Sequence, residues 1–442
     1  MAALGGVSQR MTLPVASVIC LVAGALVIVG LAAPLTKRPW VVTALGLAAA
    51  LASAFFSAHG DGTTLVVVHA VAVFLAVALL LAPSLELQIG QQRPEAVALV
   101  LLAGAGTIVL ATGGDLLQLV IGMETLSLSS ALLVALGQGE AAAEAAFKYF
   151  VLAAVSLASL VYGLGLIYLS TGSVGFPNVS GQPSSLLLAG IVLMTAGFAF
   201  ELALVPLHWG ALDAYTAAAP AVAGAVMALS KLGAVVAIVR LAPLGGGSFL
   251  FVVAMVGLLT VVWATMGALA QREIRRLLAY SAIAHAGFLA MAAGSGADGR
   301  QAAIFYVVVY GSTAMLVFAA LAGLGPEPMS FAELPARLGM QRSLALCFGL
   351  MSLAGIPPLP GFWAKLALFG PAWRALGPAP TIIGVAAAVA AAVYYLNPIP
   401  DLWNALKLPS ARAAGNAGVV LAALTVVVLT VVPGFLWAMI RI

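Results

Sequence analysis

Long apolar stretches recur along the whole chain, and charged residues rarely interrupt them. Hydrophobic residues make up 64% of the 442 positions and charged residues 7%, whereas a soluble domain carries roughly 25% charged residues. So few charges cannot build a surface that faces water, and most of the surface must therefore face lipid. Most stretches have about the 20 residues that a helix needs to cross the hydrocarbon core. The sequence therefore predicts an all-α integral membrane protein.

The hydropathy pattern predicts about fourteen transmembrane helices. The polar interruptions between them, of which the longest are Ser170–Ser184 and Gly325–Arg342, are too short for a soluble domain. The first span lacks a strongly basic leader and a cleavage site followed by a polar domain, so we interpret it as a retained helix. The expected spans are, in chain order, Leu13–Ala33, Val41–Ala58, Thr63–Ala82, Glu95–Ala111, Leu116–Leu136, Ala141–Leu169, Ser185–Trp209, Ala217–Leu241, Phe249–Ala270, Ile274–Ala293, Gln301–Leu324, Ser343–Phe369, Thr381–Leu396 and Ala417–Ile440.

Lysine and arginine in the loops indicate an orientation, because cytoplasmic loops carry an excess of both. With the N-terminus outside, ten cations fall on the inner side and five on the outer side. This bias predicts both termini outside, and the sparse charges form no basic patch for nucleic acid. The inner cations are Lys37, Arg38, Arg93, Arg272, Arg275, Arg276, Arg337, Arg342, Lys407 and Arg412, and the outer ones are Arg10, Arg240, Arg300, Arg374 and Arg441.

Among the charged side chains inside expected spans, four are the main functional candidates: Glu124, Glu201, Lys231 and Lys365. A charge at the middle of a membrane costs about 2.5–3.5 kcal/mol on insertion scales, so such residues are functional candidates. They can pair with one another and fix helix packing, or they can relay protons or ions. Two acids and two amines in separate spans favour the relay.

Three histidines also fall within spans, and histidine exchanges protons near neutral pH. His285 and His208 are candidates for the relay, and His69 is a weaker one. The alternative for each is a hydrogen-bonded packing residue between helices.

Lys148 lies near the inner end of the sixth span, four residues after Glu144. That spacing places both side chains on one helical face and favours an ion pair. The pair is either a simple surface contact or an inner access point that modulates a buried group.

Proline interrupts two spans, the seventh at Pro206 and the twelfth at Pro357 and Pro358. Proline cannot donate a backbone hydrogen bond and frees a carbonyl, which protein or water must satisfy inside a membrane. Broken helices at corresponding places in two halves are typical of the ion site of an inverted-repeat transporter. A plain kink is the alternative.

Cys20 and Cys347 both lie in apolar stretches, and the sequence has no CxxC motif or Cys/His cluster. Metal or iron–sulfur ligation by this chain is therefore not expected. No phosphate-binding loop and no nucleophile–base constellation stand out either.

Four stretches of the sequence resemble the antiporter-like membrane subunits of respiratory NADH-quinone oxidoreductases, and the similarity runs from about residue 95 to residue 395. Leu117–Leu128 resembles the fifth helix with its glutamate, Glu124. Glu144–Leu152 is most typical of the subunit N members. Arg275–Phe288 resembles a specific segment with its histidine, His285. Ser352–Lys365 resembles the broken twelfth helix with its lysine, and Lys231 falls where the family has a central lysine.

The resemblance implies fourteen helices with two inverted five-helix repeats and broken helices 7 and 12. It implies residues 1–94 as helices 1 to 3, 95–241 as the first repeat, 249–396 as the second, and 397–442 as helix 14. It further implies proton translocation along a hydrated polar axis at the middle of the bilayer. Redox energy from other subunits would drive this proton translocation, and those subunits are expected to hold FMN, iron–sulfur clusters and quinone. This chain itself is expected to bind no cofactor and no metal.

The sequence departs from the family pattern at three places. The family usually has a lysine where Glu201 stands, paired with the Glu124 position. Two carboxylates in a low-dielectric site cannot both ionise cheaply, so they would share a proton or use Lys231 as a counter-charge. The stretch His208–Tyr215 lacks the family's proline before Asp213 and has its tryptophan displaced by one, and Asn397 replaces a basic residue.

These observations predict a proton-translocating membrane subunit in a bacterial inner membrane, with other membrane subunits as partners. Lys231 would be the central carrier, Glu124 and Glu201 would set its charge, and Lys365 would pass protons onward. Two alternatives remain. One is a subunit of a multi-subunit cation/proton antiporter or membrane hydrogenase, and the other is a non-pumping structural subunit.

Overall fold

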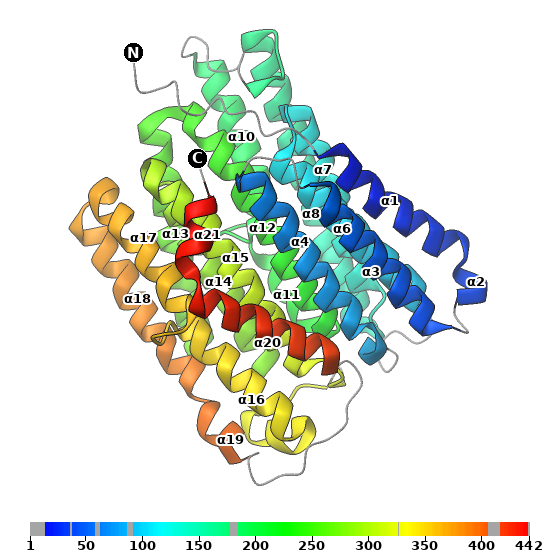
Figure 1. Ribbon diagram of the computed structural model, residues 1–442. Coiled ribbons are helices and arrows are strands. Elements are labelled where there is room, and N and C mark those ends of the chain that lie inside the picture. The colour runs from blue at the N-terminus through cyan, green and yellow to red at the C-terminus, as the bar shows by residue number, and fades with distance from the viewer. Residues whose placement is uncertain are drawn as a thin grey trace.

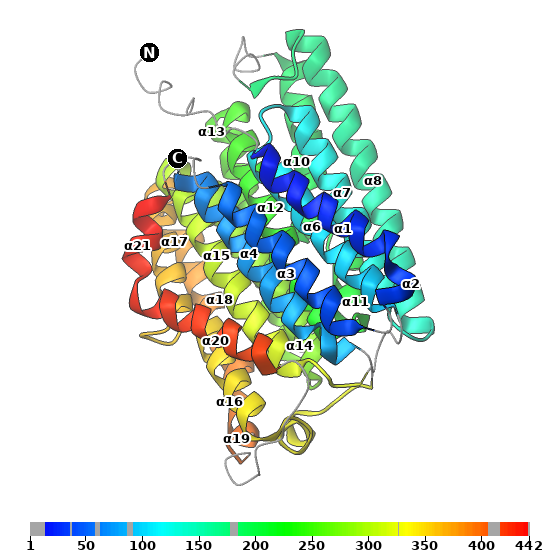
Figure 2. The same cartoon turned by 45° about the vertical axis from the view of Figure 1, so that its right-hand side comes forward.

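The computed structural model describes residues 14–35, 38–57, 62–85, 92–176, 184–325, 327–404 and 416–440, and these fold into a bundle of helices joined by short turns (Figure 1, Figure 2). The helices are, in chain order, α1 (Val15–Gly30), α2 (Ala32–Leu35), α3 (Pro39–Phe56), α4 (Gly62–Leu81), η1 (Ala82–Leu85), α6 (Arg93–Thr112), α7 (Leu116–Ala135), α8 (Glu140–Thr171), α10 (Ser185–Leu202), α11 (Trp209–Ala217), α12 (Pro220–Leu241), η2 (Ala242–Gly245), α13 (Gly246–Leu269), α14 (Ile274–Ala293), α15 (Gly296–Leu321), η3 (Phe331–Glu333), α16 (Leu334–Ala354), α17 (Pro360–Leu376), α18 (Pro378–Leu396), α19 (Ile399–Trp403), α20 (Asn416–Val431) and α21 (Pro433–Met439).

Each expected span coincides with one helix or with two consecutive helices, which confirms an all-α membrane fold. Within the described residues, ten helical stretches are long and apolar enough to cross a membrane, or eleven when the bent pair α20–α21 is included as one span. One of the ten is the 50-residue stretch Pro220–Leu269, in which η2 joins α12 to α13. The number fourteen, the repeat boundaries and the orientation stay predictions. Arg10, Lys37, Lys407, Arg412 and Arg441 lie outside the described residues.

The structure departs from the expected spans at two places. The polar stretch Gly325–Arg342 is not all loop, because α16 begins at Leu334. Ser330 and Glu333 form a capping box at the start of η3, which runs directly into α16, and in this box the Ser330 backbone N–H donates to Glu333 Oε2 at 3.1 Å. The last expected span is bent by 82° between α20 and α21, at Pro433, which cannot donate to the preceding turn.

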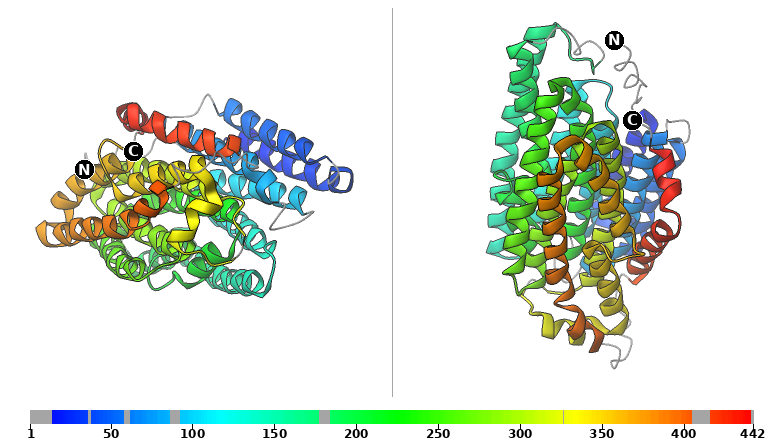
Figure 3. Two further views of the ribbon diagram at one scale, coloured as in Figure 1. Left: turned by 90° about the horizontal axis from the view of Figure 1, so that it is seen from below. Right: turned by 90° about the vertical axis from the view of Figure 1, so that its left-hand side faces the viewer.

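Burial divides the helices into a centre and a lipid-facing rim. α15 is buried along all but its first turn and α14 along most of its length, whereas α3 and α8 are mostly not buried. The first and last helices of the chain lie along the same side of the bundle (Figure 3), where α20 contacts α4. The central helices are therefore the place where a charged side chain is kept from lipid.

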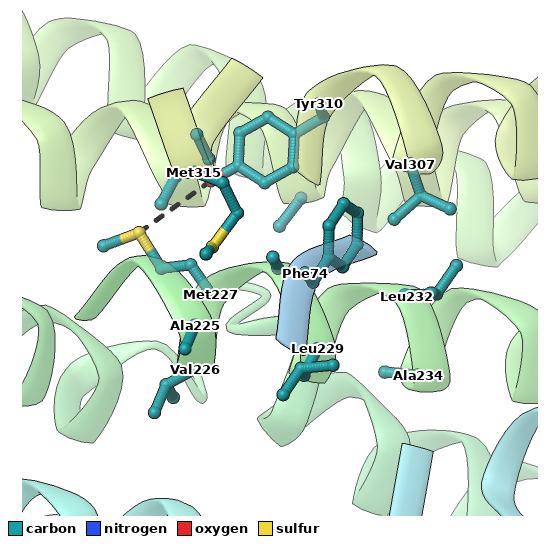
Figure 4. Packing of buried hydrophobic residues seen from close by; sticks show 14 of the residues in the cluster. Phe74, Ala225, Val226, Met227, Leu229, Leu232, Ala234, Val307, Tyr310 and Met315 are labelled. Atoms are coloured by element: carbon teal, nitrogen blue, oxygen red, sulfur yellow. Dashed lines mark hydrogen bonds between the residues drawn. The ribbon is translucent and has the colours of Figure 1, made fainter. Parts of the chain in front are cut away.

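Large side chains fill the space between α12 and α15, as Figure 4 shows. Phe74 of α4 lies against Gly311, where an added Cβ would come within 2.5 Å of the phenyl ring. The Tyr310 hydroxyl donates to Met227 Sδ at 4.0 Å. This close packing against α4 and α15 places α12 at the centre of the bundle.

Glycines let α6 and α7 approach until their backbones touch. A Cβ added at Gly106 would lie 2.6 Å from the Leu126 backbone nitrogen, and one added at Gly122 would lie 2.9 Å from the Gly106 carbonyl oxygen. Small residues at such contacts are the usual means of helix association in membranes. The contact fixes the part of α7 that carries Glu124.

Candidate functional site

Both proline-broken spans end a helix inside the bundle and leave carbonyls without a helical partner. α10 ends at Leu202, before Ala203 with φ of 65°, and α16 ends at Ala354, before Gly355 with φ of 86°. The last carbonyls of a helix lack intrahelical donors and carry the negative end of its dipole. Each break therefore offers acceptors for a cation, as the sequence predicted.

A buried lysine donates to each of these helix ends. Lys231 Nζ donates to the Leu202 carbonyl at 3.4 Å. Lys365 Nζ donates to the Leu353 carbonyl at 2.9 Å and to the Ala354 carbonyl at 2.8 Å. Both predicted lysines thus bind the carbonyl end of a broken helix, and neither forms an ion pair among the residues that the structure describes.

Lys231 lies in the middle of α12 and is fully buried. Besides the Leu202 carbonyl, its amine donates to the Tyr215 hydroxyl at 3.4 Å and lies 5.1 Å from the centre of the Tyr215 ring. Tyr215 comes from α11, the second half of the broken span. Both hydrogen bonds are long, which leaves the amine with donor capacity to spare.

Glu201, at the end of α10, is the most buried carboxylate of the site, with 1% of its surface exposed. The Tyr149 hydroxyl donates to Glu201 Oε1 at 3.2 Å, whereas Oε2 has no hydrogen-bond partner in the described part of the chain. Glu201 interacts electrostatically with Lys231 and with Glu124. Glu124 on α7 is half-buried. The two carboxylates thus interact electrostatically with each other.

His285 lies on α14 in a ring of tyrosines. Its Nδ1 lies 2.9 Å from the Tyr306 hydroxyl and its Nε2 lies 3.0 Å from the Tyr395 hydroxyl. The Tyr395 hydroxyl also shares a hydrogen bond with Ser281 Oγ. His285 interacts electrostatically with both Lys231 and Lys365, and its helix α14 contacts both α12 and α17, which carry those lysines.

His208 is separate from this arrangement. It is buried at the start of α11, and its ring centroid lies 4.1 Å from that of Trp263 on α13. His69 also stays apart, because its Nδ1 lies 2.7 Å from the Leu65 carbonyl of its own helix. The structure thus brings His285 to the lysines, and packs His208 against an aromatic ring.

Lys148 is exposed and lies at one end of the bundle. Its amine forms the predicted ion pair with Glu144 Oε1, at 2.6 Å, and a second one with Asp213 Oδ2, at 3.1 Å. Asp213 Oδ1 in turn lies 3.1 Å from Arg276 Nη1. The pair is therefore part of a larger cluster of charges that includes residues of three helices.

The sequence had assigned no role to the tyrosines that contact three of the buried ionisable groups. Their hydroxyls contact Glu201, Lys231 and His285, as described above. A signal existed, because these tyrosines stand in otherwise apolar spans, and a buried hydroxyl needs a partner. Within the described residues no group of three or more His, Cys, Asp or Glu side chains could hold a metal ion.

Comparisons with known proteins agree with this arrangement. The transmembrane family described as NADH:quinone oxidoreductase/Mrp antiporter matches residues 113–391. NADH-quinone oxidoreductase subunit N of Deinococcus radiodurans is 35% identical over 361 residues, which cover 77% of this chain and 73% of the relative. The protein of the same name from Geobacter metallireducens is 33% identical over 382 residues, which cover 82% and 81%.

Solved structures of related membrane complexes share the fold of this chain. A chain in respiratory complex I from Thermus thermophilus with bound aureothin is 30% identical, with a TM-score of 0.79 over 96% of this chain and 98% of that chain. A chain in the Mrp complex from Dietzia sp. is 20% identical, with a TM-score of 0.82 over 97% and 96%, and shares the fold. This chain belongs to the NADH:quinone oxidoreductase/Mrp antiporter transmembrane family, and within it to the NADH-quinone oxidoreductase subunit N group.

Proposed function

We propose that this chain translocates protons across a bacterial inner membrane as subunit N of an NADH-quinone oxidoreductase. The observation that carries the proposal is the pair of buried lysines, each of which donates to the carbonyls of a broken helix and not to a carboxylate. A lysine locked in a close ion pair would keep its proton, whereas one held by neutral carbonyls can lose it.

The arrangement supports a sequence of proton transfers. Lys231 is the central carrier, and Glu201 and Glu124 set its charge state, because burial favours the neutral amine and a nearby carboxylate favours the ammonium. His285 links Lys231 to Lys365 with the help of the Tyr306 and Tyr395 hydroxyls. Glu201 Oε2 lacks a hydrogen-bond partner among the described residues, and the Ser127 hydroxyl is close enough to influence the carboxyl group, so this oxygen is open to a proton or a water molecule.

The chemistry that drives this transfer belongs to other subunits. FMN, iron–sulfur clusters and quinone are held by partners, and this chain performs no redox step and binds no cofactor. Its partners are other membrane subunits of the complex, and both of its termini face the outside. Lys148 and His208 take lesser parts, Lys148 at the inner surface and His208 as a packing residue at the broken span.

The first prediction concerns Lys231. In the intact complex, Lys231→Ala is expected to lower proton pumping by roughly tenfold or more, because a positioned proton donor contributes at least that much. Proton pumping is measured against electron transfer in reconstituted vesicles. Lys231→Arg is the decisive companion, because arginine keeps the charge and cannot give up its proton. Unchanged pumping in Lys231→Ala would contradict the proposed function.

Two alternatives have an observation in their favour. The likeness to the Mrp complex chain suits a subunit of a cation/proton antiporter or of a membrane hydrogenase. The subunits that copurify with this chain distinguish these, because only the proposed complex carries NADH-oxidising partners. Glu201 in place of the usual lysine suits a non-pumping structural subunit. Normal assembly with lost pumping in both Lys231 variants would exclude that role.

A further inference from the structure

Asp213 joins three helices at one end of the bundle. Its Oδ2 lies 3.1 Å from Lys148 Nζ on α8, and its Oδ1 lies 3.1 Å from Arg276 Nη1 on α14. Each carboxylate oxygen thus holds a different cation, while Glu144 holds Lys148 from the other side at 2.6 Å. Asp213 itself belongs to α11, so one side chain ties α11 to both neighbours.

Each of these three helices also carries a residue of the buried site. On α8, Tyr149 follows Lys148 directly, and its hydroxyl donates to Glu201. On α11, Tyr215 stands two residues after Asp213 and accepts from Lys231. On α14, His285 lies nine residues after Arg276, about 13.5 Å along the helix axis.

α11 depends on such contacts for its position. It has nine residues and follows the break in the seventh span, and isolated helices shorter than about 12 residues are marginal. Its main packing neighbours are α8 and α14, the two helices to which Asp213 is bound, and it makes a smaller contact with α12. A Cβ added at Gly210 of α11 would lie 3.2 Å from the Tyr149 Cα atom, so α11 and α8 are already in close contact beside Tyr149.

We propose that Asp213 is a positioning residue for proton transfer, which holds α11 between Lys148 and Arg276 so that Tyr215 stays in hydrogen-bond contact with Lys231. The inference rests on the proposed function, because it needs Lys231 to carry protons. It goes beyond that function by assigning a role to the half-exposed cluster of Glu144, Lys148, Asp213 and Arg276. Asp213 acts through Tyr215 and does not itself touch the transferred proton.

The test is Asp213→Asn in the intact complex, measured per assembled complex. The expected result is a ratio of protons pumped to electrons transferred that is about two- to tenfold lower, since two half-exposed ion pairs are lost. Asp213→Glu keeps the charge and is expected to recover most of the ratio. Lys148→Gln and Arg276→Gln each remove one cation and are expected to lower the ratio of protons pumped to electrons transferred by a smaller amount. These two variants test the proposal if Asp213→Asn does not assemble.

A double variant separates positioning from simple stabilisation. If Asp213 acts through Tyr215, Asp213→Asn combined with Tyr215→Phe is expected to lower the ratio no further than Tyr215→Phe alone. Additive losses, or a change confined to assembly and thermal stability, would overturn the proposal.

The chain offers a matched control in Asp298. This exposed aspartate forms an ion pair with Arg374 at 2.6 Å. The pair lies at the opposite end of the bundle from Asp213, because Asp298 follows the C-terminal end of α14, whereas Arg276 lies at the N-terminal end of that helix. Asp298→Asn is expected to pump like the unaltered protein. A normal ratio in every Asp213, Lys148 and Arg276 variant, together with loss in Lys231→Ala, would reject the positioning role and leave the proposed function standing.

Discussion

At the scale of single residues, the site separates its amines from its acids. The lysines donate to carbonyl oxygens, while Glu201 receives a tyrosine hydroxyl. A buried polar atom without a partner costs about 1–3 kcal/mol, so each of these partners stabilises one protonation state over another. Tyrosine suits this role, because its hydroxyl can donate to a carboxylate and accept from an amine.

Tyr149 gives a prediction at this scale. Tyr149→Phe removes the donor to Glu201 and leaves the ring in place, and it is expected to lower proton pumping about two- to tenfold, the equivalent of one buried hydrogen bond. Electron transfer and pumping are measured together in vesicles. Tyr162→Phe is the control, because Tyr162 lies on the same helix and is 64% exposed. Equal effects of the two changes would contradict a role for the Tyr149 hydroxyl.

Sequence reasoning at the residue scale found the ionisable groups and not their partners. Glu124, Glu201, Lys231 and Lys365 stand out because a charge in an apolar stretch is rare. The partner of each charge depends on which helices pack together, and the hydropathy of one span carries no information about that. His208 illustrates the limit, since the sequence left a relay residue and a packing residue open, and only the structure shows its ring against Trp263.

At the scale of helices, the breaks were predictable, because Pro206 and Pro357 interrupt apolar spans. Which side chain binds the freed carbonyls was only partly predictable. The proline positions say where a carbonyl is freed, and the lysine that binds it comes from another helix in the first break, α12, and from the continuing half in the second, α17. The bend at Pro433 follows the same rule, yet the expected span ran straight through it.

Helix contact through glycine gives a prediction at the same scale. Gly122→Ala places a methyl group against the backbone of α6, which cannot move aside, so it is expected to destabilise the protein by about 1–3 kcal/mol and to displace Glu124. The thermal denaturation midpoint of the detergent-purified complex measures the loss. Gly165→Ala is the matched control in α8, where an added Cβ meets nothing within 4 Å. A midpoint for Gly122→Ala as high as that for Gly165→Ala would show that α6 and α7 tolerate separation.

At the scale of the whole molecule, the two broken spans lie in different halves of the chain, and central α14 lies between their lysines. The membrane fold could be predicted from composition alone, because a chain with so few charged residues must turn most of its surface toward lipid. It did not give the division into a buried centre and an exposed rim, because α15 and α3 are both apolar and only packing decides which one faces lipid.

The last prediction tests whether the two halves act as one path. His285→Gln removes the titratable ring between Lys231 and Lys365 and keeps an amide that can bond the same hydroxyls, so pumping is expected to fall roughly tenfold or more while assembly is kept. His69→Gln is the matched control, because that ring bonds only a carbonyl of its own helix among the described residues. Pumping is compared with electron transfer in the same vesicles. If the His285 variant pumped as well as the His69 variant, each lysine would work within its own half, and the tyrosine ring around His285 would be a packing device alone.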